Sequence, residues 1–419
     1  MDAAFTCDSL AMLTRERMKE LSGERPAAEG RTAVGLADRP APATPELTIV
    51  ANDIGGVGGM ERQLAELVIE LARLGYKVTV IARTCELPDG TGAVFHRVRG
   101  PSRPFAIAYP WFVLIASVAV LRWRRGIVQA TGAIVLTPVD VVAVHYCHRV
   151  ATPTPSRSTR LFRAHIRLAG VLKRIGESVC FRISRAARFV CVSDGVAQEV
   201  REYHPGLASR TLTIHNGVDT ETFAPGRHLE LARAMRSELG IGEGRLVAAF
   251  VGGEWERKGL RLVIEALAYA REWDLVVAGG GDEKAYRELA DALGVGGAVH
   301  WLGITREVPA VYELADAFVM ASSYETFSLV TFEAAASGLP IVATPVSGVR
   351  ELIEDGNNGY LIERDPRAIA ERLRRLAAEP QLRIRLGRAA RRSALAFTSE
   401  RMVAGYHELY SRLAEPRSR

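Results

Sequence analysis

Two glutamates, Glu325 and Glu333, stand eight positions apart in the stretch ETFSLVTFEAAASGLP. An apolar run, AFVMA, comes shortly before this stretch and has the composition of a buried strand. Ser328 is a favoured residue at the start of a helix, and Gly338 followed by Pro340 is typical of a helix end. The sequence therefore predicts a strand, a tight loop that contains Glu325, and a helix that begins at Ser328.

The start of this predicted helix is suited to binding an anion. The backbone N–H groups of Ser328, Leu329 and Val330 have no partner within the helix, and such groups bind phosphate. Glu333 lies about a turn and a half into the helix, on a different azimuth from Glu325, so the two carboxylates do not share a proton. They suit hydroxyl groups at the two ends of a ligand whose middle is phosphate, which is the layout of a nucleotide sugar. The alternative is a solvated glutamate at each position.

A glycine-rich turn follows the first predicted strand, residues 47–51, and opens the helix after it. Its sequence GGVGG spans residues 55–59 and does not match a dinucleotide-binding fingerprint, because Glu61 stands where the last glycine is needed. Gly58 and Gly59 allow a ligand to approach the backbone at a helix start. A plain tight turn is the alternative, but four glycines in five positions exceed what a turn requires.

Two further loops are rich in glycine: one also carries positive charge, and the other allows a ligand to approach the backbone. The loop GGEWERKG follows a predicted strand and contains Gly253, Arg257 and Lys258. Positive charge at a strand-to-helix turn suits a diphosphate. Gly280 lies in a second loop, GGG, where a ligand can also approach the backbone.

His145 lies at the carboxyl end of a strand predicted over residues 139–146. Open sheets of parallel strands bind ligands at the carboxyl ends of their strands, so this position favours a functional histidine over a structural one. His148 is the weaker candidate and is expected to face the loop.

Strands and helices alternate through most of the chain, which predicts an α/β fold with two doubly wound, Rossmann-like sheets. The segment HNGVD at 215–219 has the turn residues of a linker. We expect a disordered tail over 1–45, a first domain over 46–225, a second domain over 226–396, and a C-terminal helix and tail over 397–419.

The composition is that of an ordinary globular protein of 419 residues, with a net charge of +6. The five cysteines are scattered without a C-x-x-C pair, so neither a disulfide framework nor a zinc site is indicated. No signal peptide is visible at the amino terminus, and a cytoplasmic location is expected.

Two segments bear on membrane contact. Residues 105–121 are apolar, but at 17 residues with Pro110 near the start they fall short of a spanning helix, so a buried helix is the preferred interpretation. Contact with a membrane interface through Trp111 and Trp123 stays open. The second segment, 149–188, holds ten Lys or Arg and one acid among interleaved apolar residues. It is either an ordinary solvated helix or a docking site for an anionic membrane or a phosphorylated lipid acceptor.

The chain resembles the family 4 glycosyltransferases, with a weaker similarity to the branch of the lipopolysaccharide core glucosyltransferases. The resemblance extends over about residues 47–413. Several short motifs carry it: Glu325-x-Phe327-Ser328-Leu329 with Glu333, Gly338 and Pro340; Gly58-Gly59 with Glu61; Asn216-Gly217-Val218-Asp219; Lys258-Gly259; and His145 after Val144. It implies a GT-B architecture, in which two Rossmann-like domains face each other across a cleft and the last helix crosses back to the N-terminal domain.

The resemblance also implies a function. The enzyme would transfer a hexose with retention of anomeric configuration from a nucleotide sugar to a glycan or lipid-linked acceptor in cell-envelope or exopolysaccharide synthesis, without a cofactor, a bound metal or nucleic acid. The catalytic set would be His145, Arg257, Lys258 and Glu325, and the donor-binding set Gly58, Gly59, Gly253, Gly280, Phe327, Ser328, Leu329 and Glu333. Gly253 departs from the family, which often has an arginine there, and Arg257 would supply that charge. The alternatives are a sugar-nucleotide epimerase, a sugar phosphorylase and a non-catalytic binding scaffold.

Overall fold

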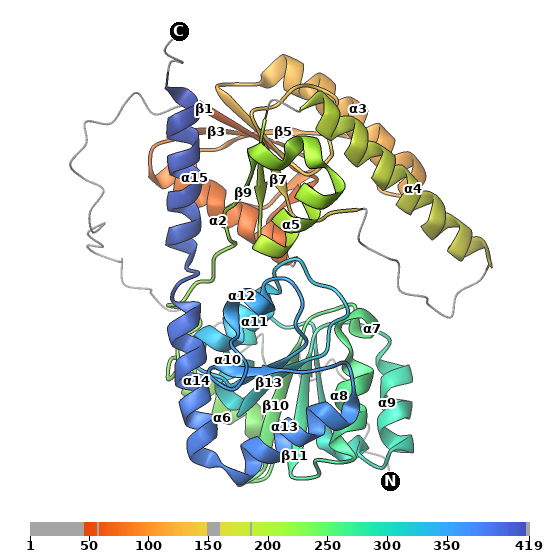
Figure 1. The fold of residues 1–419 in the computed structure, drawn as a ribbon, viewed down its shortest axis with the longest axis vertical. Coiled ribbons are helices and arrows are strands. Elements are labelled where there is room, and N and C mark those ends of the chain that lie inside the picture. Colours follow the sequence, from red (N-terminus) through yellow and green to blue (C-terminus); the bar gives the residue numbers. More distant parts are fainter. Residues whose placement is uncertain (1–45, 57, 149–159, 185–186, 416–419) are drawn as a thin grey trace. The chain divides into compact units, whose positions relative to one another are not determined.

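The computed structural model describes residues 46–56, 58–148, 160–184 and 187–415, with side chains of the long helix after residue 159 described from Arg167 onward. The predicted tail over 1–45 lies outside the described residues. Two parallel sheets and their helices make up the described chain (Figure 1), which confirms the predicted α/β fold with two doubly wound sheets.

The N-terminal sheet has seven parallel strands in the order β5-β3-β1-β6-β7-β8-β9. Their bounds are β1 Glu46–Val50, β3 Lys77–Ala82, β5 Val94–Arg97, β6 Ile127–Thr131, β7 Val141–Val144, β8 Arg188–Cys191 and β9 Thr211–Thr213. A short pair, β2 Asp53–Ile54 and β4 Thr84–Cys85, lies beside it. The sequence did not indicate β5, because half-exposed VFHR lacks a run of buried residues.

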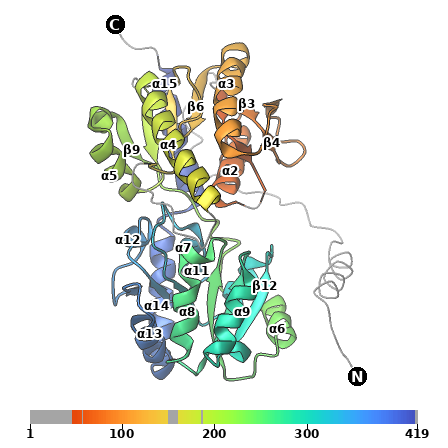
Figure 2. The same cartoon turned by 90° about the vertical axis from the view of Figure 1, so that its right-hand side faces the viewer.

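Alternate residues of these strands face opposite layers of helices, as the pleat of a strand requires. Leu47 and Ile49 pack with α2 (Gly59–Arg73) and with α15 (Ser399–Ala414). Val50, on the other face, belongs to the core formed with α3 (Phe105–Trp123), α4 (Arg160–Ile183) and α5 (Asp194–Tyr203). Figure 2 shows α3 and α4 lying side by side on this second face.

The C-terminal sheet has six parallel strands in the order β12-β11-β10-β13-β14-β15. Their bounds are β10 Leu246–Val251, β11 Trp273–Ala278, β12 Val299–Gly303, β13 Ala317–Met320, β14 Ile341–Ala343 and β15 Gly359–Leu361. The helices that go with it are α6 Leu229–Glu238, α7 Trp255–Lys258, α8 Leu260–Leu267, α9 Glu283–Ala292, α10 Val308–Leu314, α11 Leu329–Ala336, α12 Val349–Leu352, α13 Pro366–Ala378 and α14 Pro380–Ala394.

The last helix, α15, returns to the N-terminal sheet as predicted. Tyr410 is fully buried and donates a hydrogen bond of 2.6 Å to Gln129 Oε1 on β6. A second contact joins Tyr76 Oη to His407 Nδ1 on α15, at a distance of 2.8 Å. The polypeptide therefore begins and ends its described part on the same sheet.

The segment 215–219 is more than the linker that the sequence indicated. Val218 pairs with Thr398 as an isolated parallel bridge, and the Gly217 N–H donates to Gln63 Oε1 at 2.9 Å. A Cβ on Gly217 would lie 2.3 Å from the Ser399 backbone, so glycine is required there. The segment thus fastens α2 to the start of α15.

Helix α3 departs from the prediction of a buried helix. Its inner side is buried, with Ala116 and Val120 fully inaccessible, but Leu114 and Leu121 on its outer side are 55% and 67% exposed. Among the described helices α3 is the one whose length and composition would allow it to cross a membrane, a property it shares with core helices of many other proteins.

Strand order places the functional loops. Each sheet reverses its direction of winding at one point, between β1 and β6 in the first and between β10 and β13 in the second. Loops that follow the two strands at such a switch point diverge and leave room for a ligand at the carboxyl edge. The glycine turn 55–59 follows β1, whereas the loops with Lys258 and Glu325 follow β10 and β13.

Candidate active site

Two predicted cations and one predicted carboxylate meet at the switch point of the C-terminal sheet. Lys258 Nζ and Arg257 Nη1 each lie 2.9 Å from Glu325 Oε1, and Ser322 Oγ donates to the same oxygen at 2.9 Å. Lys258 and Glu325 are both buried, with 8% and 9% of their surface exposed. All three contacts end on Oε1, so Oε2 of Glu325 keeps its capacity to accept a hydrogen bond from a ligand.

Glycines make this close packing possible. Gly252 has φ of 127°, and a Cβ there would lie 2.7 Å from Lys258 Cε. Gly259, with φ of 79°, ends the single turn α7, and a Cβ there would meet the Ala321 carbonyl oxygen at 2.3 Å. Both positions have a positive φ that glycine tolerates. The loop after β10 can therefore turn sharply and bring Lys258 beside the end of β13.

The electrostatics of Glu325 follow from this arrangement. Burial works to raise its pKa, but the charges of Lys258 and Arg257 and the hydrogen bonds from Lys258 and Ser322 outweigh burial, so the pKa is lowered. The carboxylate is therefore ionised at neutral pH and holds the two cations in fixed positions.

Helix α11 begins where the sequence predicted, but the Ser328 side chain does not cap it. Ser328 has φ of 63°, in the left-handed region, and its hydroxyl lies 2.8 Å from Thr331 Oγ1 instead of capping the helix backbone. Phe327 is buried and stacks on Phe332 with ring centroids 4.0 Å apart. This stacking and the packing of Gly348 under the Phe327 carbonyl lock the turn, so the N–H groups at the helix start have a fixed direction.

Glu333 lies on α11 with both oxygens in contact with protein groups. Arg62 Nη2 on α2 is 2.9 Å from Oε1, and Tyr312 Oη donates to Oε2 at 3.2 Å. Burial raises the pKa of Glu333 above its usual value, although Arg62 and Tyr312 work to lower it. Arg62 was not predicted as a site residue, although its position three residues after Gly59, in the first turn of α2, was a usable signal.

Predicted glycines also come together from distant parts of the chain. A Cβ on Gly59 would lie 3.8 Å from Leu329 Cδ2, so the start of α2 approaches the start of α11. A Cβ on Gly253 would lie 3.5 Å from the Gly280 carbonyl oxygen, which places the loops after β10 and β11 in contact. Gly58 precedes α2 with ordinary φ of −73°, and a Cβ there would clash with the Glu61 carboxylate.

His145 follows β7 at the carboxyl edge of the N-terminal sheet. Its Nε2 atom is buried and has no hydrogen-bond partner among the described residues. Burial lowers its pKa to about 4, so the imidazole is neutral at physiological pH. No contact joins it to Glu325 or Lys258, and its place in the site stays a prediction. The His148 ring lies 5.0 Å from the Tyr146 ring and belongs to the loop, as expected.

Two sets of contacts near the site were not predicted from the sequence. Tyr324, directly before Glu325, donates a hydrogen bond of 3.1 Å to Glu199 Oε2 on α5. Burial raises the pKa of Glu199 to about 7, against the opposing hydrogen bond from Tyr324. Glu351 on α12 accepts hydrogen bonds from the backbone N–H groups of Asp194 and Gly195 at the start of α5. No sequence motif marks either pair, because each joins elements far apart in the chain.

A hollow of about 430 Å³ lies at the carboxyl ends of β13, β14 and β15. Its lining includes Ser322, Thr344, Leu361 and Arg364. The hydroxyl of Ser322, one of these lining residues, is bonded to Glu325 Oε1.

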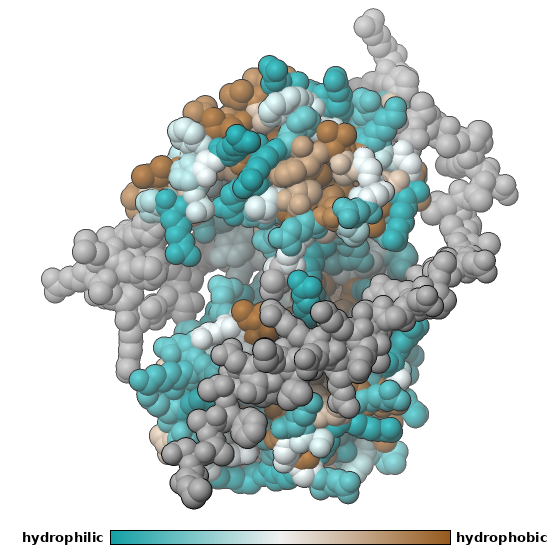
Figure 3. Space-filling model, turned by 180° about the vertical axis from the view of Figure 1, so that it is seen from behind, coloured by the Kyte–Doolittle hydropathy of each residue, from teal (hydrophilic) through white to brown (hydrophobic). Residues whose placement is uncertain are grey.

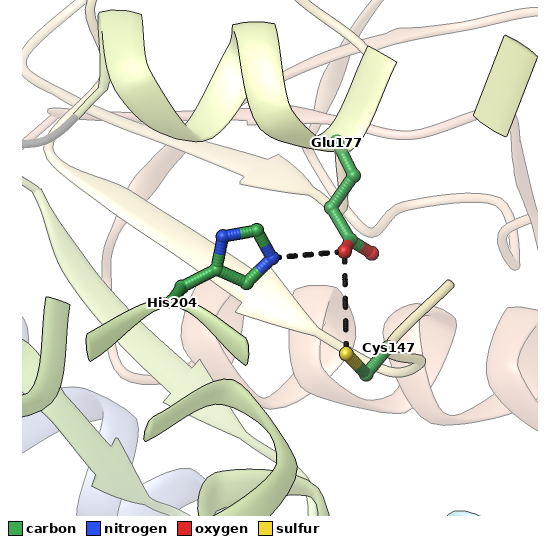
Figure 4. A group of neighbouring side chains, drawn as sticks. All are labelled: Cys147, Glu177 and His204. Carbon is green, nitrogen blue, oxygen red and sulfur yellow. Dashed lines mark hydrogen bonds and ion pairs between the residues drawn. The ribbon is translucent and has the colours of Figure 1, made fainter. Parts of the chain in front are cut away.

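Two side-chain groups in the described chain have the composition of a metal site. Figure 4 shows the first: Cys147 and His204 both point toward Glu177, whose Oε1 lies 4.0 Å from the Cys147 sulfur and 3.0 Å from His204 Nε2. Glu177 Oε2 also accepts a hydrogen bond of 2.7 Å from the His148 N–H. The network ties α4 to the loop after β7 and to the end of α5, and these bonds account for a buried carboxylate.

The second group joins Asp194, His215 and Glu351. His215 Nε2 lies 2.7 Å from Glu351 Oε2, and Glu351 also accepts hydrogen bonds from the backbone N–H groups of Asp194, Gly195 and Gly348. Neither group includes a residue of the predicted catalytic or donor-binding sets, although the His215 ring lies 6.4 Å from the Phe327 ring by centroids.

Comparison with known proteins agrees with this architecture. The structure superposes on that of WaaG, a glycosyltransferase involved in lipopolysaccharide biosynthesis, with a TM-score of 0.72 at 20% identity, over 87% of this chain and 99% of that chain. It also superposes on Anabaena Alr3699/HepE in complex with UDP-glucose, with a TM-score of 0.68 at 18% identity, over 88% and 100% of the two chains. The fold is therefore that of the GT-B glycosyltransferases.

Family models identify the branch within this class. The model of group 1 glycosyl transferases matches residues 232–393, and the model of glycosyltransferase family 4 matches residues 57–222. The chain belongs to the group 1, family 4 glycosyltransferases.

Curated relatives agree with this assignment. The D-inositol 3-phosphate glycosyltransferase of Corynebacterium urealyticum is 27% identical over 393 residues, which are 86% of this chain and 92% of that protein. Other curated relatives, 32% to 34% identical, are matched over only 54% to 61% of their own length.

Proposed function

We propose that this protein is a retaining hexosyltransferase that moves a sugar from a nucleoside-diphosphate sugar to a glycan or lipid-linked acceptor in cell-envelope or exopolysaccharide synthesis. The observation that carries the proposal is the convergence of Arg257 and Lys258 on Glu325 at the switch point of the C-terminal sheet. Two fixed cations beside the start of α11 suit a diphosphate whose charge increases as the sugar leaves.

In this proposal the charge that develops on the leaving β-phosphate is stabilised by Arg257, Lys258 and the N–H groups at Ser328 and Gly59. Because these groups are held by the protein before the ligand arrives, they need no reorganisation during the reaction. Glu325 Oε2 accepts a hydrogen bond from a sugar hydroxyl, while Oε1 stays with its three protein donors. No side chain is assigned as a nucleophile: the acceptor attacks from the leaving-group side, and a phosphate oxygen takes its proton.

Glu333 is proposed to accept hydrogen bonds from the ribose hydroxyls. Since Arg62 occupies Oε1 and Tyr312 Oε2, a ribose must share these oxygens or displace Arg62. Displacement is feasible because the Arg62 side chain is 44% exposed and can be solvated when released. Nucleotide binding would then change a contact between α2 and α11.

The acceptor is proposed to bind on the side of the N-terminal sheet, near His145. Its neutral imidazole and buried Nε2 suit a hydrogen bond with a hydroxyl group better than an ion pair. The choice of a UDP-linked hexose as the first donor to test has support from the UDP-glucose bound to the HepE structure.

A cytoplasmic enzyme without cofactor or bound metal completes the proposal. The charges of Arg257 and Lys258 take the place that a divalent cation has in other sugar transferases. Activity should therefore survive dialysis against a chelator, and a loss that Mg²⁺ or Mn²⁺ restores would contradict this part.

The test is release of nucleotide from UDP-, GDP- and ADP-hexoses, preceded by a thermal-shift screen in which a ligand at one hundred times its dissociation constant stabilises by about 2.7 kcal/mol. The proposal predicts slow donor hydrolysis that is accelerated by an acceptor glycan. Epimerised sugar released without an acceptor would identify an epimerase, and a requirement for inorganic phosphate would identify a phosphorylase. Binding without turnover would leave a scaffold.

A further inference from the structure

Helix α3 exposes an apolar stripe on the side opposite the core. Ile107, Trp111, Leu114, Val118 and Leu121 are 45% to 67% exposed. They follow one another at steps of four and three residues, so they share one face of the helix. The inner face is as apolar as the outer one and is packed against the sheet, so α3 cannot leave the domain to span a membrane without opening the core.

Helix α4 repeats this pattern beside it. Leu168, Val171, Ile175, Val179 and Ile183 are 36% to 55% exposed and lie at steps of three and four residues. The opposite side of α4 carries Glu177 and Phe181, which are buried toward the sheet. An amphipathic surface helix normally buries its apolar face, and α4 instead presents a second apolar stripe to the solvent.

The two stripes form one surface. The two helices touch, since a Cβ on Gly176 of α4 would lie 2.1 Å from Tyr109 Oη of α3, and both cover the same face of the sheet. Their outward sides therefore belong to one exposed surface, here called the α3–α4 outer face. Figure 3 shows apolar groups gathered on the part of the molecule that carries α3 and α4. Contiguous apolar surface of this kind marks an interaction site.

Charge selects the partner. Exposed basic side chains border the outer face: Arg122, Arg124 and Arg125 at the end of α3, and Arg167, Arg174 and Arg182 on α4. The sequence of α3 has no acid, and the one acid of α4, Glu177, is 1% exposed. A second copy of this chain would bring like charges together, whereas an anionic bilayer offers both apolar depth and opposite charge.

We propose that the α3–α4 outer face docks the protein on an anionic lipid bilayer, with the apolar stripes at the acyl boundary and the arginines at the headgroups. A hollow of about 490 Å³ beside the stripe of α4, lined by Arg174, Ile175 and Tyr203, has the mixed polarity of a headgroup site. The proposal concerns a partner surface of the N-terminal sheet and does not depend on the donor or the acceptor.

The test is co-sedimentation of the full chain with vesicles of phosphatidylcholine alone or mixed with phosphatidylglycerol. Wild-type protein should bind the mixed vesicles, bind the neutral ones poorly, and dissociate as salt increases. Replacing Arg167, Arg174 and Arg182 by Gln should lower the partition coefficient about a hundredfold, since each basic residue near the surface contributes about fivefold. The variant Leu114→Gln/Val118→Gln/Leu121→Gln should lose binding even at low salt.

The matched control replaces Arg385, Arg388 and Arg392 by Gln. These residues are exposed on α14 and their loss changes the net charge by the same amount. The control should bind mixed vesicles within about threefold of wild type. Three results would overturn the proposal: no binding of wild-type protein at low salt, equal loss in the control, or a solution dimer that the α3 variant converts to monomer without a change in vesicle binding. Thermal unfolding of each variant verifies that it is folded.

Discussion

The buried polar groups at the carboxyl edges of the two sheets differ in whether they have a bonding partner. At the edge of the C-terminal sheet, Glu325 and Lys258 are buried and bound to each other. At the edge of the N-terminal sheet, His145 Nε2 and Thr131 Oγ1 are buried with no hydrogen-bond partner. Of the five such orphan atoms in the described part of the chain, four lie on β6, on the loop after it or just after β7.

This difference suggests a division of labour. Buried charges with fixed partners suit a ligand whose charge is always the same, such as a diphosphate. Buried polar atoms without partners cost free energy unless water or a ligand satisfies them, so the two at this edge, His145 Nε2 and Thr131 Oγ1, mark a place that a polar ligand can fill. The first edge is thus the donor side of the proposed reaction and the second the acceptor side. Five substitutions probe the two sides, from the largest expected effect to the smallest.

Lys258→Ala removes one of the two cations that Glu325 holds. Turnover in the nucleotide-release assay should fall on the order of a hundredfold, as for the loss of one preorganised donor. Lys284→Ala, an exposed lysine on α9, is the matched control and should retain activity. Near-normal turnover of Lys258→Ala would remove Lys258 from the site and leave Arg257 as the next candidate.

Glu333→Ala and Glu325→Ala should separate two roles on the donor side. Glu333→Ala should weaken binding of free nucleoside diphosphate and of nucleotide sugar alike, by tenfold or more, because a hydrogen bond to a charged group contributes about 1.5 to 3 kcal/mol. In that variant the Tyr312 hydroxyl can donate to the Val330 carbonyl oxygen, 3.1 Å away, so the fold should survive. Glu325→Ala should leave the diphosphate affinity nearly intact and impair transfer. Calorimetry that gives the reverse pattern would exchange the two assignments.

His145 should make stability depend on pH. The unfolded state binds a proton on this histidine below about pH 6.5, but the folded state does so only near pH 4. Stability is therefore complete above pH 6.5 and is lost as the pH falls toward 4, by about 2 kcal/mol at pH 5. Urea unfolding of His145→Gln, which cannot titrate, should show a shallower decline. Parallel curves for the two proteins would contradict the buried, neutral state of His145.

Glu199 should contribute a smaller effect of opposite sign. Its folded pKa of about 7 exceeds the value in the unfolded chain, so it stabilises the fold below about pH 4.5 and loses this contribution as the pH rises through 7. The free energy of unfolding of Glu199→Gln, measured relative to wild type, should therefore be more favourable to the folded state at pH 8 than at pH 5. The gain should be small because the side chain is partly exposed. A constant difference at both pH values would show that Glu199 does not titrate in this range.

Much of the fold could be predicted from local patterns. The C-terminal strands stood out because parallel strands buried on both faces are continuous apolar runs, as β10 and β14 are. Glycine turns marked the loops that later proved to need left-handed backbone, such as Gly252 and Gly259. Strand β5 was missed because it lies at the sheet edge and three of its four residues are exposed.

The site was predictable by residue type but not by pairing. Lys258, Arg257 and Glu325 were each expected near a diphosphate, yet nothing in their spacing showed that both cations bind one oxygen of Glu325. The partners of Glu333 come from α2 and α10, far away in the chain, and such contacts leave no local pattern. The exposed side of α3 was mistaken for core because an apolar residue looks the same whether it faces a sheet or the solvent.

The most direct test of the donor site is a calorimetric titration of UDP, GDP and ADP into wild-type protein and into Lys258→Ala, with the corresponding monophosphates as controls. We expect that at least one diphosphate binds wild-type protein, that its monophosphate binds far more weakly, and that Lys258→Ala loses at least tenfold in affinity for the diphosphate. Equal binding of the diphosphate by Lys258→Ala, or no binding of any diphosphate by wild-type protein, would contradict a diphosphate site at Lys258 and the start of α11.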